Sequence, residues 1–448
     1  MSYFLFPKII NCLTEKNFEV KFSNNVNYYV SKTLYSYLIS IKKEIDKYNS
    51  QWDNFKKFTN PYEYIHTYNT DLKLSVCKLK PISRAFYKLI EICNIFNLLN
   101  YEDDMITFHL AEGPGGFMEA VNYLRENNND IYYGITLINN DANVPSWKKS
   151  KVLIENNKFK IEYGPSKDGN LFKKENLLYY YETMVNSVDL VTGDGGFDFS
   201  LDFNNQETNS FKLILVQVIY ALCIQKKGGS FVLKIFDIFT LPTIHIIFIL
   251  SSIYENVFIC KPNTSRIANS EKYLVCKNYK FNKNIIKYFI NNFDNLFNNN
   301  QNIYSLINLK IPYLFLSKVE EYNAIYGQQQ IENINFTINL INISNNKKQK
   351  IKDNNKSTDN KCTDNKSVDN NKMHNDNNKS IDNKTCIEIE KENNLSTIVI
   401  ENNIEYIDID NNNTTISSTN NNLEIIKKNN LHKCVQWCIR NNLPFNTI

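Results

Sequence analysis

The sequence lacks several features that would assign it to a class of protein at once. It has no strong excess of charge: 51 lysines and arginines stand against 47 aspartates and glutamates, a formal net charge of +4. This balance excludes a histone-like polycation but is compatible with a nucleic-acid enzyme, which needs only a local basic cleft. The chain of 448 residues is 42% hydrophobic and 13% aromatic, enough apolar material for two or three folded domains.

Signals for export and for membrane insertion are also lacking. The first ten residues do not show the charged, apolar and small-residue pattern of a secretory signal. The most apolar stretch, 231–250, is interrupted by Lys234, Asp237 and Pro242 within the roughly 20 residues that a membrane-spanning helix needs. We therefore expect no membrane association.

Ten cysteines are scattered along the chain, and no C-x-x-C pair occurs. Several lie in apolar runs, where a thiol behaves as a small hydrophobic group. This usage is typical of an intracellular, reducing compartment. His432, Cys434 and Cys438 are close in sequence, but three residues on one short helix do not close a tetrahedral zinc site, so we expect no metal.

Composition divides the chain into zones. Residues 1–340 are rich in aromatic side chains, whereas 342–430 are dominated by polar residues and contain a degenerate Asp-Asn-Lys-Ser/Thr repeat. Such a segment has few apolar side chains to bury, so 342–430 is predicted to be a disordered linker. Residues 431–448 are predicted to form a short amphipathic helix that docks on a protein partner or on its own domain.

Strands and helices alternate between about residues 80 and 280. The predicted strands are 106–110, 130–137, 160–163, 187–192, 230–235, 256–261 and 273–277. The predicted helices are 80–99, 117–125, 207–227 and 241–253, the third of them ended by Gly228 and Gly229. This order predicts an α/β domain with a mixed, mostly parallel sheet covered on both faces, in which ligands bind at the carboxyl ends of the strands. The predicted domains are a mostly helical N-terminal region (1–74), the α/β domain (75–282), a helical extension (283–341), the linker and the C-terminal helix.

Two glycine-rich motifs follow predicted strands. In 109–117, a strand runs through Glu-Gly-Pro-Gly-Gly into a helix, so that backbone N–H groups can approach a ligand. The motif is neither G-x-G-x-x-G nor a Walker loop, which disfavours a dinucleotide or a triphosphate, and a plain tight turn is the alternative. In 189–197, Asp194 is delivered at the end of an apolar strand; the alternative is a turn-forming Asp-Gly without chemistry.

Two further motifs place charges at strand ends. Lys234 ends a buried strand, where a lysine needs a partner, and Asp194 on the adjacent strand is the natural one. The alternative is a purely structural ion pair. The loop 261–271 is rich in polar side chains and brings Glu271 to the start of the last strand.

Together these motifs resemble the FtsJ-like ribose 2′-O-methyltransferases. The resemblance rests on Ser83-Arg-Ala-x-x-Lys88-Leu-x-Glu91, Gly-Pro-Gly-Gly, Gly-Asp194-Gly-Gly, Leu-Lys234 and Ser-Glu271, in that order over about residues 80–280. Within that superfamily the chain is most similar to the Adrift-type cap-specific mRNA 2′-O-methyltransferases, and 28–68 is similar to viral members. The resemblance implies a Rossmann-like methyltransferase fold, S-adenosyl-L-methionine as cofactor and capped mRNA as substrate.

The resemblance also implies roles for individual residues. The catalytic tetrad falls on Lys88, Asp194, Lys234 and Glu271. The cofactor-binding positions are Glu112, Gly113, Pro114, Gly115, Gly116, Phe117, Asp168, Gly169 and Asp194. The RNA-contacting positions are Ser83, Arg84 and Asn269. The sequence departs from the bacterial members at His109, where they have an acidic residue; we expect His109 to face the core.

These residue types suit the implied reaction. A ribose 2′-OH is a poor acid, so its proton has to be drawn off or its developing charge stabilised as it attacks the sulfonium methyl group. Lys234 would draw off the proton or stabilise the charge. Asp194 would orient Lys234, and Glu271 would hold Lys88. Most of the rate would come from holding the reacting atoms in line.

Other functions stay open on the sequence alone. The chain could be an idle RNA-binding or scaffolding subunit on the same fold, although that alternative predicts a missing tetrad residue or a blocked cofactor loop, and the sequence shows neither. It could also act on an RNA other than mRNA. The asparagine- and lysine-rich composition is typical of a large cytoplasmic DNA virus or of an AT-rich protist, so we expect a cytoplasmic protein, in a virus factory or virion, or a nuclear one if it is cellular.

Overall fold

The computed structural model describes residues 1–10, 13–69, 73–100, 102–138, 145–196, 205–359 and 417–446. The chain forms two compact units. The first comprises 1–343 and 422–448 and contains every predicted site residue; the second, 344–421, is described only where two helices run into it.

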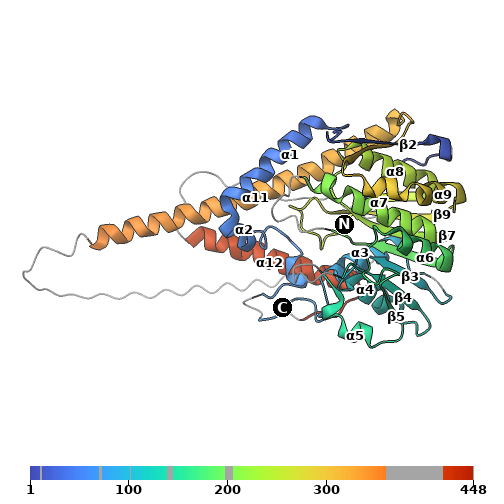
Figure 1. The fold of residues 1–448 in the computed structure, drawn as a ribbon. Coiled ribbons are helices and arrows are strands. Elements are labelled where there is room, and N and C mark those ends of the chain that lie inside the picture. Colours follow the sequence, from blue (N-terminus) through green and yellow to red (C-terminus); the bar gives the residue numbers. More distant parts are fainter. Residues whose placement is uncertain are drawn as a thin grey trace, which may run out of the picture. The chain divides into compact units, whose positions relative to one another are not determined.

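Strands and helices alternate through most of the first unit (Figure 1). The strands are β1 Ser2–Leu5, β2 Phe18–Ser23, β3 Ile106–Leu110, β4 Ile131–Ile135, β5 Phe159–Glu162, β6 Val188–Gly193, β7 Gln225–Ile235, β8 Tyr254–Lys261, β9 Lys272–Tyr279 and β10 Asn302–Ile307. The helices are α1 Lys32–Glu44, α2 Asn49–Phe55, α3 Ala85–Phe96, α4 Gly116–Arg125, α5 Lys151–Ile154, α6 Lys174–Met184, α7 Gln206–Ile224, α8 Leu241–Ile253, α9 Lys283–Asn291, α10 Phe293–Asn298, α11 Tyr313–Asp359 and α12 Ser417–Arg440.

One sheet organises the unit, with the strand order β1-β8-β9-β7-β6-β3-β4-β5. The strands from β5 to β7 are parallel, and β9, β8 and β1 continue the sheet in antiparallel pairs. This is the mixed, mostly parallel sheet of a Rossmann-like methyltransferase fold, so the predicted fold class is confirmed for the described α/β domain. A separate two-stranded sheet pairs β2 with β10.

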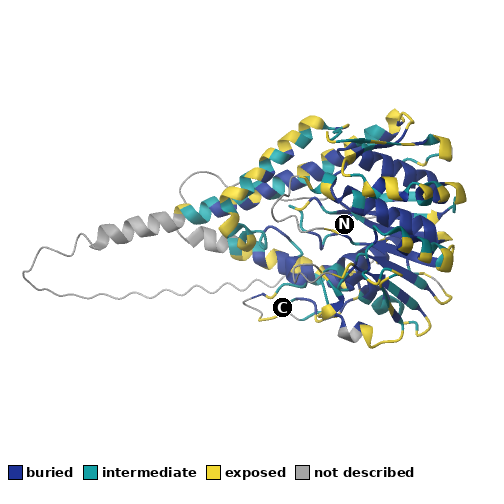
Figure 2. Ribbon diagram, in the orientation of Figure 1, coloured by how far each residue is buried: buried dark blue, intermediate teal, exposed yellow. Residues whose placement is uncertain are grey.

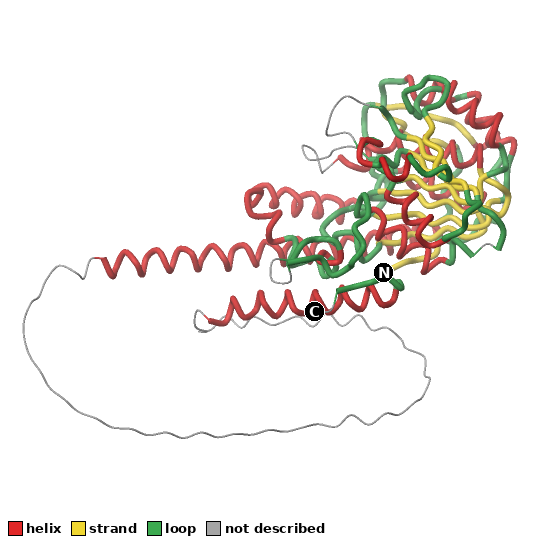
Figure 3. Tube along the Cα trace, turned by 90° about the horizontal axis from the view of Figure 1, so that it is seen from below, coloured by secondary structure: helices red, strands yellow, loops and turns green. Residues whose placement is uncertain are grey.

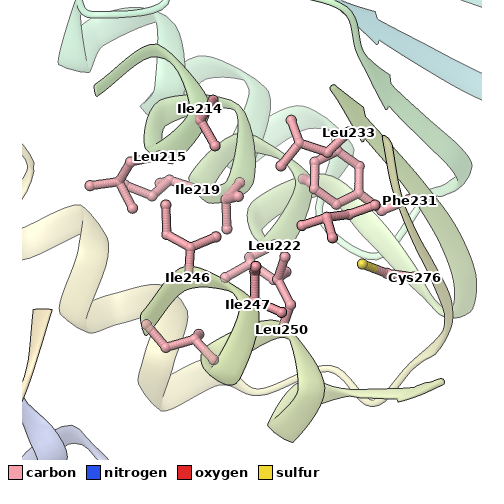
Figure 4. Packing of buried hydrophobic residues seen from close by; sticks show 14 of the residues in the cluster. Ile214, Leu215, Ile219, Leu222, Phe231, Leu233, Ile246, Ile247, Leu250 and Cys276 are labelled. Atoms are coloured by element: carbon pink, nitrogen blue, oxygen red, sulfur yellow. The ribbon is translucent and has the colours of Figure 1, made fainter. Parts of the chain in front are cut away.

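Helices cover both faces of the large sheet (Figure 3). Because side chains of a strand alternate between faces, Phe231 and Leu233 on β7 pack with α7 and α8, whereas Val232 packs with α3 and α4. Figure 4 shows the first of these two cores, and Figure 2 shows how deeply it is buried. Within the described residues, α7 is the helix that is long and apolar enough to cross a membrane, but 83% of its apolar window is buried in this core.

The N-terminal region, expected to be mostly helical, contains β1 and β2 besides α1 and α2. Strand β1 adds to the edge of the sheet beside β8, and the hydroxyl groups of Tyr322 and Tyr326 on α11 donate to the carbonyl oxygens of Leu5 and Ser2. The partners of β1 and β2 lie far along the chain, so a local pattern does not reveal them.

Helix α7 ends earlier than predicted. It was expected to reach residue 227, but it ends at Ile224, and Gln225 is already extended as the first residue of β7. Gln225 pairs with Val188 of β6, and its side-chain oxygen accepts a hydrogen bond from Tyr254. These tertiary contacts outweigh the glycine signal three residues further on.

Part of the predicted linker is helical. Helix α11 continues to Asp359 and α12 begins at Ser417, so the bounds 342–430 were wrong at both ends. Residues 342–359 contain neither glycine nor proline, and extension of an anchored helix gains one hydrogen bond per residue fixed. The remainder of the predicted linker, 360–416, lies outside the described residues.

Helix α12 docks on its own domain. Cys434, Trp437 and Cys438 are buried in the core beside α3, and the ring of Trp437 lies 6.0 Å from that of Tyr87. The chain after α12 then pairs with residues 76–78 through backbone hydrogen bonds. The apolar face of this helix is therefore used inside the chain, and nothing in the described residues assigns it to a protein partner.

Replacing Trp437 with alanine should destabilise the protein by about 3–5 kcal/mol, because a buried aromatic ring is lost and a cavity is left. Urea denaturation followed by circular dichroism measures this. Ile439→Ala on the same helix, where the side chain is exposed, should change the stability by less than about 0.5 kcal/mol. Equal midpoints for wild type and Trp437→Ala would contradict the docking of α12.

Candidate active site

Four charged residues meet at the carboxyl edge of the sheet. Asp194 directly follows β6, and Lys234 is the last residue but one of β7. Strand β9 runs antiparallel to β7 with Tyr273 opposite Lys234, so Glu271, just before β9, also reaches this edge. Lys88 comes from the second turn of α3. The structure thus brings together all four residues of the predicted tetrad.

The four side chains form two ion pairs. The Lys88 Nζ lies 2.7 Å and 2.9 Å from the two carboxylate oxygens of Glu271. The Lys234 Nζ lies 3.2 Å from Asp194 Oδ1 and donates to the Asp194 carbonyl oxygen at 2.6 Å. The hydroxyl of Tyr273 also donates to Asp194 Oδ1, at 2.9 Å. With side chains 7–18% exposed, the pairs are mostly desolvated but still open to a reactant.

Electrostatic coupling links the two pairs. Burial alone would raise the pKa of Glu271, but the charges of Lys88 and Lys234 together lower this pKa well below its usual range. Glu271 is therefore ionised at neutral pH. The site holds two ammonium groups and two carboxylates, which balance in charge.

The glycine-rich turn lies at the end of β3, close to the tetrad. Gly115 has a φ of 99° and directly precedes α4, and a Cβ added there would lie 3.0 Å from the side chains of Trp147 and Leu153. Only glycine fits this conformation and this space. Gly113 is packed equally tightly, with Thr136 and Pro145 each 3.0 Å from the position of a Cβ.

The turn presents backbone and one buried carboxylate. Gly116 begins α4, and the Pro114 carbonyl accepts a hydrogen bond from Ser150. Phe117, predicted to contact cofactor, is 1% exposed and packs in the core near Tyr273. Its aromatic side chain thus contributes to packing beneath the turn.

Glu112 is buried at the end of β3. One of its oxygens accepts a hydrogen bond from Thr192, and the other, Oε2, faces the imidazole ring of His109. Burial raises the pKa of Glu112. His109 is fully buried between Thr107 and Thr192, with Nδ1 3.2 Å from Glu112 Oε2, so it faces the core as predicted.

The Asp168 loop borders the same region. The Asp168 carbonyl accepts a hydrogen bond from Ile138 N at 2.8 Å, and its carboxylate lies 2.9 Å from Lys173 Nζ. A Cβ on Gly169, where φ is 67°, would lie 2.0 Å from the carbonyl oxygen of Thr136. Thr136 thus touches both glycine segments, which brings the Asp168 loop beside the glycine-rich turn.

The predicted RNA-contacting residues lie around the tetrad in different settings. The Ser83 Oγ sits over Gly116, 2.1 Å from where a Cβ would be. Arg84 precedes α3; burial lowers its pKa, as does the charge of Arg266, while Glu271 acts in the opposite sense. Asn269 is exposed on the 262–271 loop.

The residues that hold this loop had no role predicted from the sequence. Glu91 on α3 accepts hydrogen bonds from the backbone N–H groups of Asn263 at 3.1 Å and Thr264 at 3.4 Å. The Lys261 Nζ donates to the carbonyl oxygens of Asn269 at 2.5 Å and Glu271 at 2.9 Å. Glu91 and Lys261 stand within the motifs quoted above, but only the fold shows what they bind.

A buried triad fixes the neighbouring strand ends. The Asp237 carboxylate lies 3.0 Å from Lys42 Nζ of α1 and 3.1 Å from Lys272 Nζ of β9. Lys272 also donates to the Ser270 carbonyl at 2.9 Å. Burial would raise the pKa of Asp237, but the two lysines lower it to about 2. This triad ties the residues just after Lys234 to those beside Glu271.

Comparison with known proteins assigns the class. The model of the FtsJ-like methyltransferase family matches residues 81–279, which contain the whole tetrad. The cap-specific mRNA (nucleoside-2′-O-)-methyltransferase of Autographa californica nuclear polyhedrosis virus is 34% identical over 263 residues, covering 58% of this chain and 86% of the viral protein. The chain belongs to the FtsJ-like methyltransferase family, which confirms the predicted resemblance.

Cellular relatives match over a smaller share of their length. Cap-specific mRNA (nucleoside-2′-O-)-methyltransferase 1 of Dictyostelium discoideum is 30% identical over 332 residues, 66% of this chain and 42% of that protein. The inactive cap-specific mRNA (nucleoside-2′-O-)-methyltransferase 1B of Caenorhabditis briggsae is 30% identical over 250 residues, 52% of this chain and 29% of that protein. The chain spans less than half the length of these two relatives.

Asp237→Asn should destabilise the protein in a pH-dependent way. Since the pKa of Asp237 is about 2 in the folded state and near 3.8 when unfolded, the carboxylate stabilises the fold by about 2 kcal/mol above pH 4. That stabilisation is lost as the pH falls towards 2. Urea unfolding of both proteins from pH 7 to pH 2 measures the difference.

The matched control is Asp294→Asn, which breaks an exposed pair with Lys174 and should change stability little at any pH. A difference between wild type and Asp237→Asn that stays constant down to pH 2 would contradict the assigned ion triad.

Proposed function

We propose that this chain transfers the methyl group of S-adenosyl-L-methionine to a ribose 2′-OH of RNA, with the 5′ end of capped mRNA as substrate. The observation that carries the proposal is the pairing of Lys88 with Glu271 and of Lys234 with Asp194 at one strand edge. The names of the viral and Dictyostelium relatives support the cap-specific substrate.

The residues near the glycine-rich turn fit the cofactor. The buried carboxylate of Glu112, which contacts Thr192 and His109, has lone pairs left to accept from the ammonium group of an amino acid. Gly113 and Gly115 leave the turn without side chains, so its backbone can approach a ligand. Asp168 and Gly169 would hold the adenosine end, and Asp194 would lie near the sulfonium. When bound, the cofactor supplies an electrophilic methyl group.

The chain's own residues would activate and orient the hydroxyl. Lys234 is held at two points by Asp194, so its ammonium group has a fixed direction. From there the ammonium group would donate a hydrogen bond to the 2′-oxygen and stabilise the charge that develops on it, or Nζ, after releasing one proton to water, would accept the proton of the 2′-OH as its oxygen attacks the methyl group. Lys88, held by Glu271, keeps a second cation beside the same oxygen. Because the supports are already in place, little reorganisation accompanies the reaction.

Arg84 and Asn269 would bind the RNA beside the ribose. Arg84 is mostly buried near Arg266 and Glu271, and the described residues offer its guanidinium no hydrogen bond. A backbone phosphate would supply the missing acceptors. Asn269 presents an exposed amide on the rim of the site, and Ser83 would act through its position over the start of α4.

An idle RNA-binding subunit is the competing function. A relative named as inactive is 30% identical to this chain, so identity at this level does not by itself imply activity. The geometry here favours an enzyme, because all four tetrad side chains are present and paired.

Lys234→Ala should lower methyl transfer to capped RNA by about 10²- to 10⁴-fold, since the group that handles the proton is lost. Transfer of tritium from labelled S-adenosyl-L-methionine to short capped and uncapped RNAs measures this. Lys226→Ala, at the opposite end of the same strand with a half-exposed side chain, should retain activity. No transfer to any RNA by folded, cofactor-bound wild type would instead favour the idle subunit.

Gly115→Ala should weaken cofactor binding by at least about tenfold, because the added methyl group strains a residue with positive φ and meets Trp147 and Leu153. Isothermal titration calorimetry with S-adenosyl-L-methionine gives the affinity. Gly228→Ala carries the same type of backbone strain at φ 84° but has open space around it, far along β7 from the turn. Equal affinities for the two variants would argue against the turn as the cofactor site.

A further inference from the structure

The loop 262–271, which carries Glu271 into the site, is held in part by residues outside the region that matches the family. Glu63 lies in the N-terminal region and Gln330 on α11, whereas the family match covers 81–279. The Gln330 amide donates to the Ala268 carbonyl at 2.6 Å. Glu63 makes a stronger contact with the loop than Gln330 does, because it forms an ion pair with Arg266.

Glu63 binds Arg266, in the middle of this loop, through a two-point ion pair. Arg266 Nε donates to Glu63 Oε2 at 3.0 Å, and Nη2 donates to Oε1 at 2.6 Å. The carboxylate also accepts hydrogen bonds from Asn60 at 2.7 Å and Thr67 at 3.1 Å, and it is 1% exposed. Two-point contacts of this kind fix direction as well as distance.

The segment that carries Glu63 is itself anchored. Asn333 on α11 donates to the Thr59 carbonyl at 2.8 Å, and the hydroxyl groups of Thr59 and Thr337 lie 2.7 Å apart. Asn430 on α12 donates to the Phe58 carbonyl at 2.8 Å. Glu63 thus connects the 262–271 loop to a support built from α11 and α12.

The positive charge of Arg266 also affects Glu271 of the tetrad. Ser265, the residue before Arg266, donates to Glu271 Oε1 at 2.9 Å, so Arg266 lies on the same short loop as the carboxylate that holds Lys88 and interacts with it electrostatically. While the guanidinium of Arg266 is paired with Glu63, it is directed away from Glu271 and does not compete with Lys88 for that carboxylate. Without Glu63, the partly buried guanidinium of Arg266 would lose its carboxylate partner and would compete with Lys88 for Glu271.

We propose that Glu63 is a positioning residue for methyl transfer: by holding Arg266 it fixes the 262–271 loop and keeps Glu271 available to Lys88. The N-terminal region is then a working part of the active site. This inference rests on the proposed function for its kinetic test, but not for its structural one.

Glu63→Gln tests it, because the amide keeps the size of the side chain and removes its charge. We expect kcat to fall by about 10- to 100-fold, as for a misplaced catalytic group, while the affinity for S-adenosyl-L-methionine changes less than about twofold. Hydrogen–deuterium exchange of a peptide spanning 262–271 should become faster than in wild type.

Asp130→Asn is the matched control. Asp130 makes a buried two-point pair with Arg125, at 2.8 Å and 3.0 Å, near the amino ends of the strands. This variant should lose comparable thermal stability yet keep its kcat and the slow exchange of the 262–271 loop.

A double variant tests the route of the effect. If Glu63 acts through Arg266, then Glu63→Gln combined with Arg266→Gln should lower kcat no further than Arg266→Gln alone. If the double variant instead lowers kcat by the product of the two single effects, the claim that Glu63 acts through Arg266 is overturned.

The remaining outcomes distinguish the positioning role of Glu63 from the proposed methyl-transfer function. Wild-type kcat and wild-type loop exchange in folded Glu63→Gln would overturn the inference, and so would an equal loss of kcat in Asp130→Asn. If wild type methylates no RNA, the proposed function fails, and the exchange of the 262–271 loop alone decides the positioning role: faster exchange only in Glu63→Gln supports it, and unchanged exchange overturns it.

Discussion

Buried charge must be paired, and this constraint shapes the whole carboxyl edge of the sheet. Lys88 and Lys234 are almost removed from water, and an unpaired ammonium group there would cost several kcal/mol. Glu271 and Asp194 supply the balance. Each pair joins two elements that are distant in the sequence, so the pairs form only when α3, β6, β7 and β9 are assembled in the observed order. The chemistry and the fold therefore depend on the same contacts.

Further charged groups around the tetrad fix the backbone that presents it. Glu91 and Lys261 bind backbone groups of the 262–271 loop, and Asp237 joins the ends of β7 and β9 to α1. Glu63 adds the N-terminal region to this set. A site built in this way is rigid before the reactants arrive, which suits a reaction whose rate comes mainly from alignment and fixed charges.

Local patterns predicted the interior of the α/β domain well. The strand 106–110 and the helix 241–253 were predicted with the bounds that the structure shows, because apolar runs are local signals. The tetrad came from the resemblance to a family, and the structure brings its four members together. The strand β1 was missed because its partner β8 lies at the other end of the domain. The end of α7 was predicted three residues too late because the pairing of Gln225 is tertiary.

Polar groups behind the tetrad were harder to predict for the same reason. Glu63 and Arg266 are separated by most of the α/β domain, and nothing in either local sequence marks one as the partner of the other. The helix α11 was cut short in the prediction because composition was taken as a sign of disorder, although asparagine and lysine do not stop a helix that packing has already started.

If the two ion pairs direct a methyl group to a ribose oxygen, the position of that methyl group can be read from the product. Mass spectrometry of nucleosides released from capped RNA, after reaction with the full chain and isotopically labelled S-adenosyl-L-methionine, identifies it. We expect label on the 2′-oxygen of a nucleotide next to the cap, in a linkage that alkali no longer cleaves. Label on a base, or an alkali-sensitive product, would contradict it.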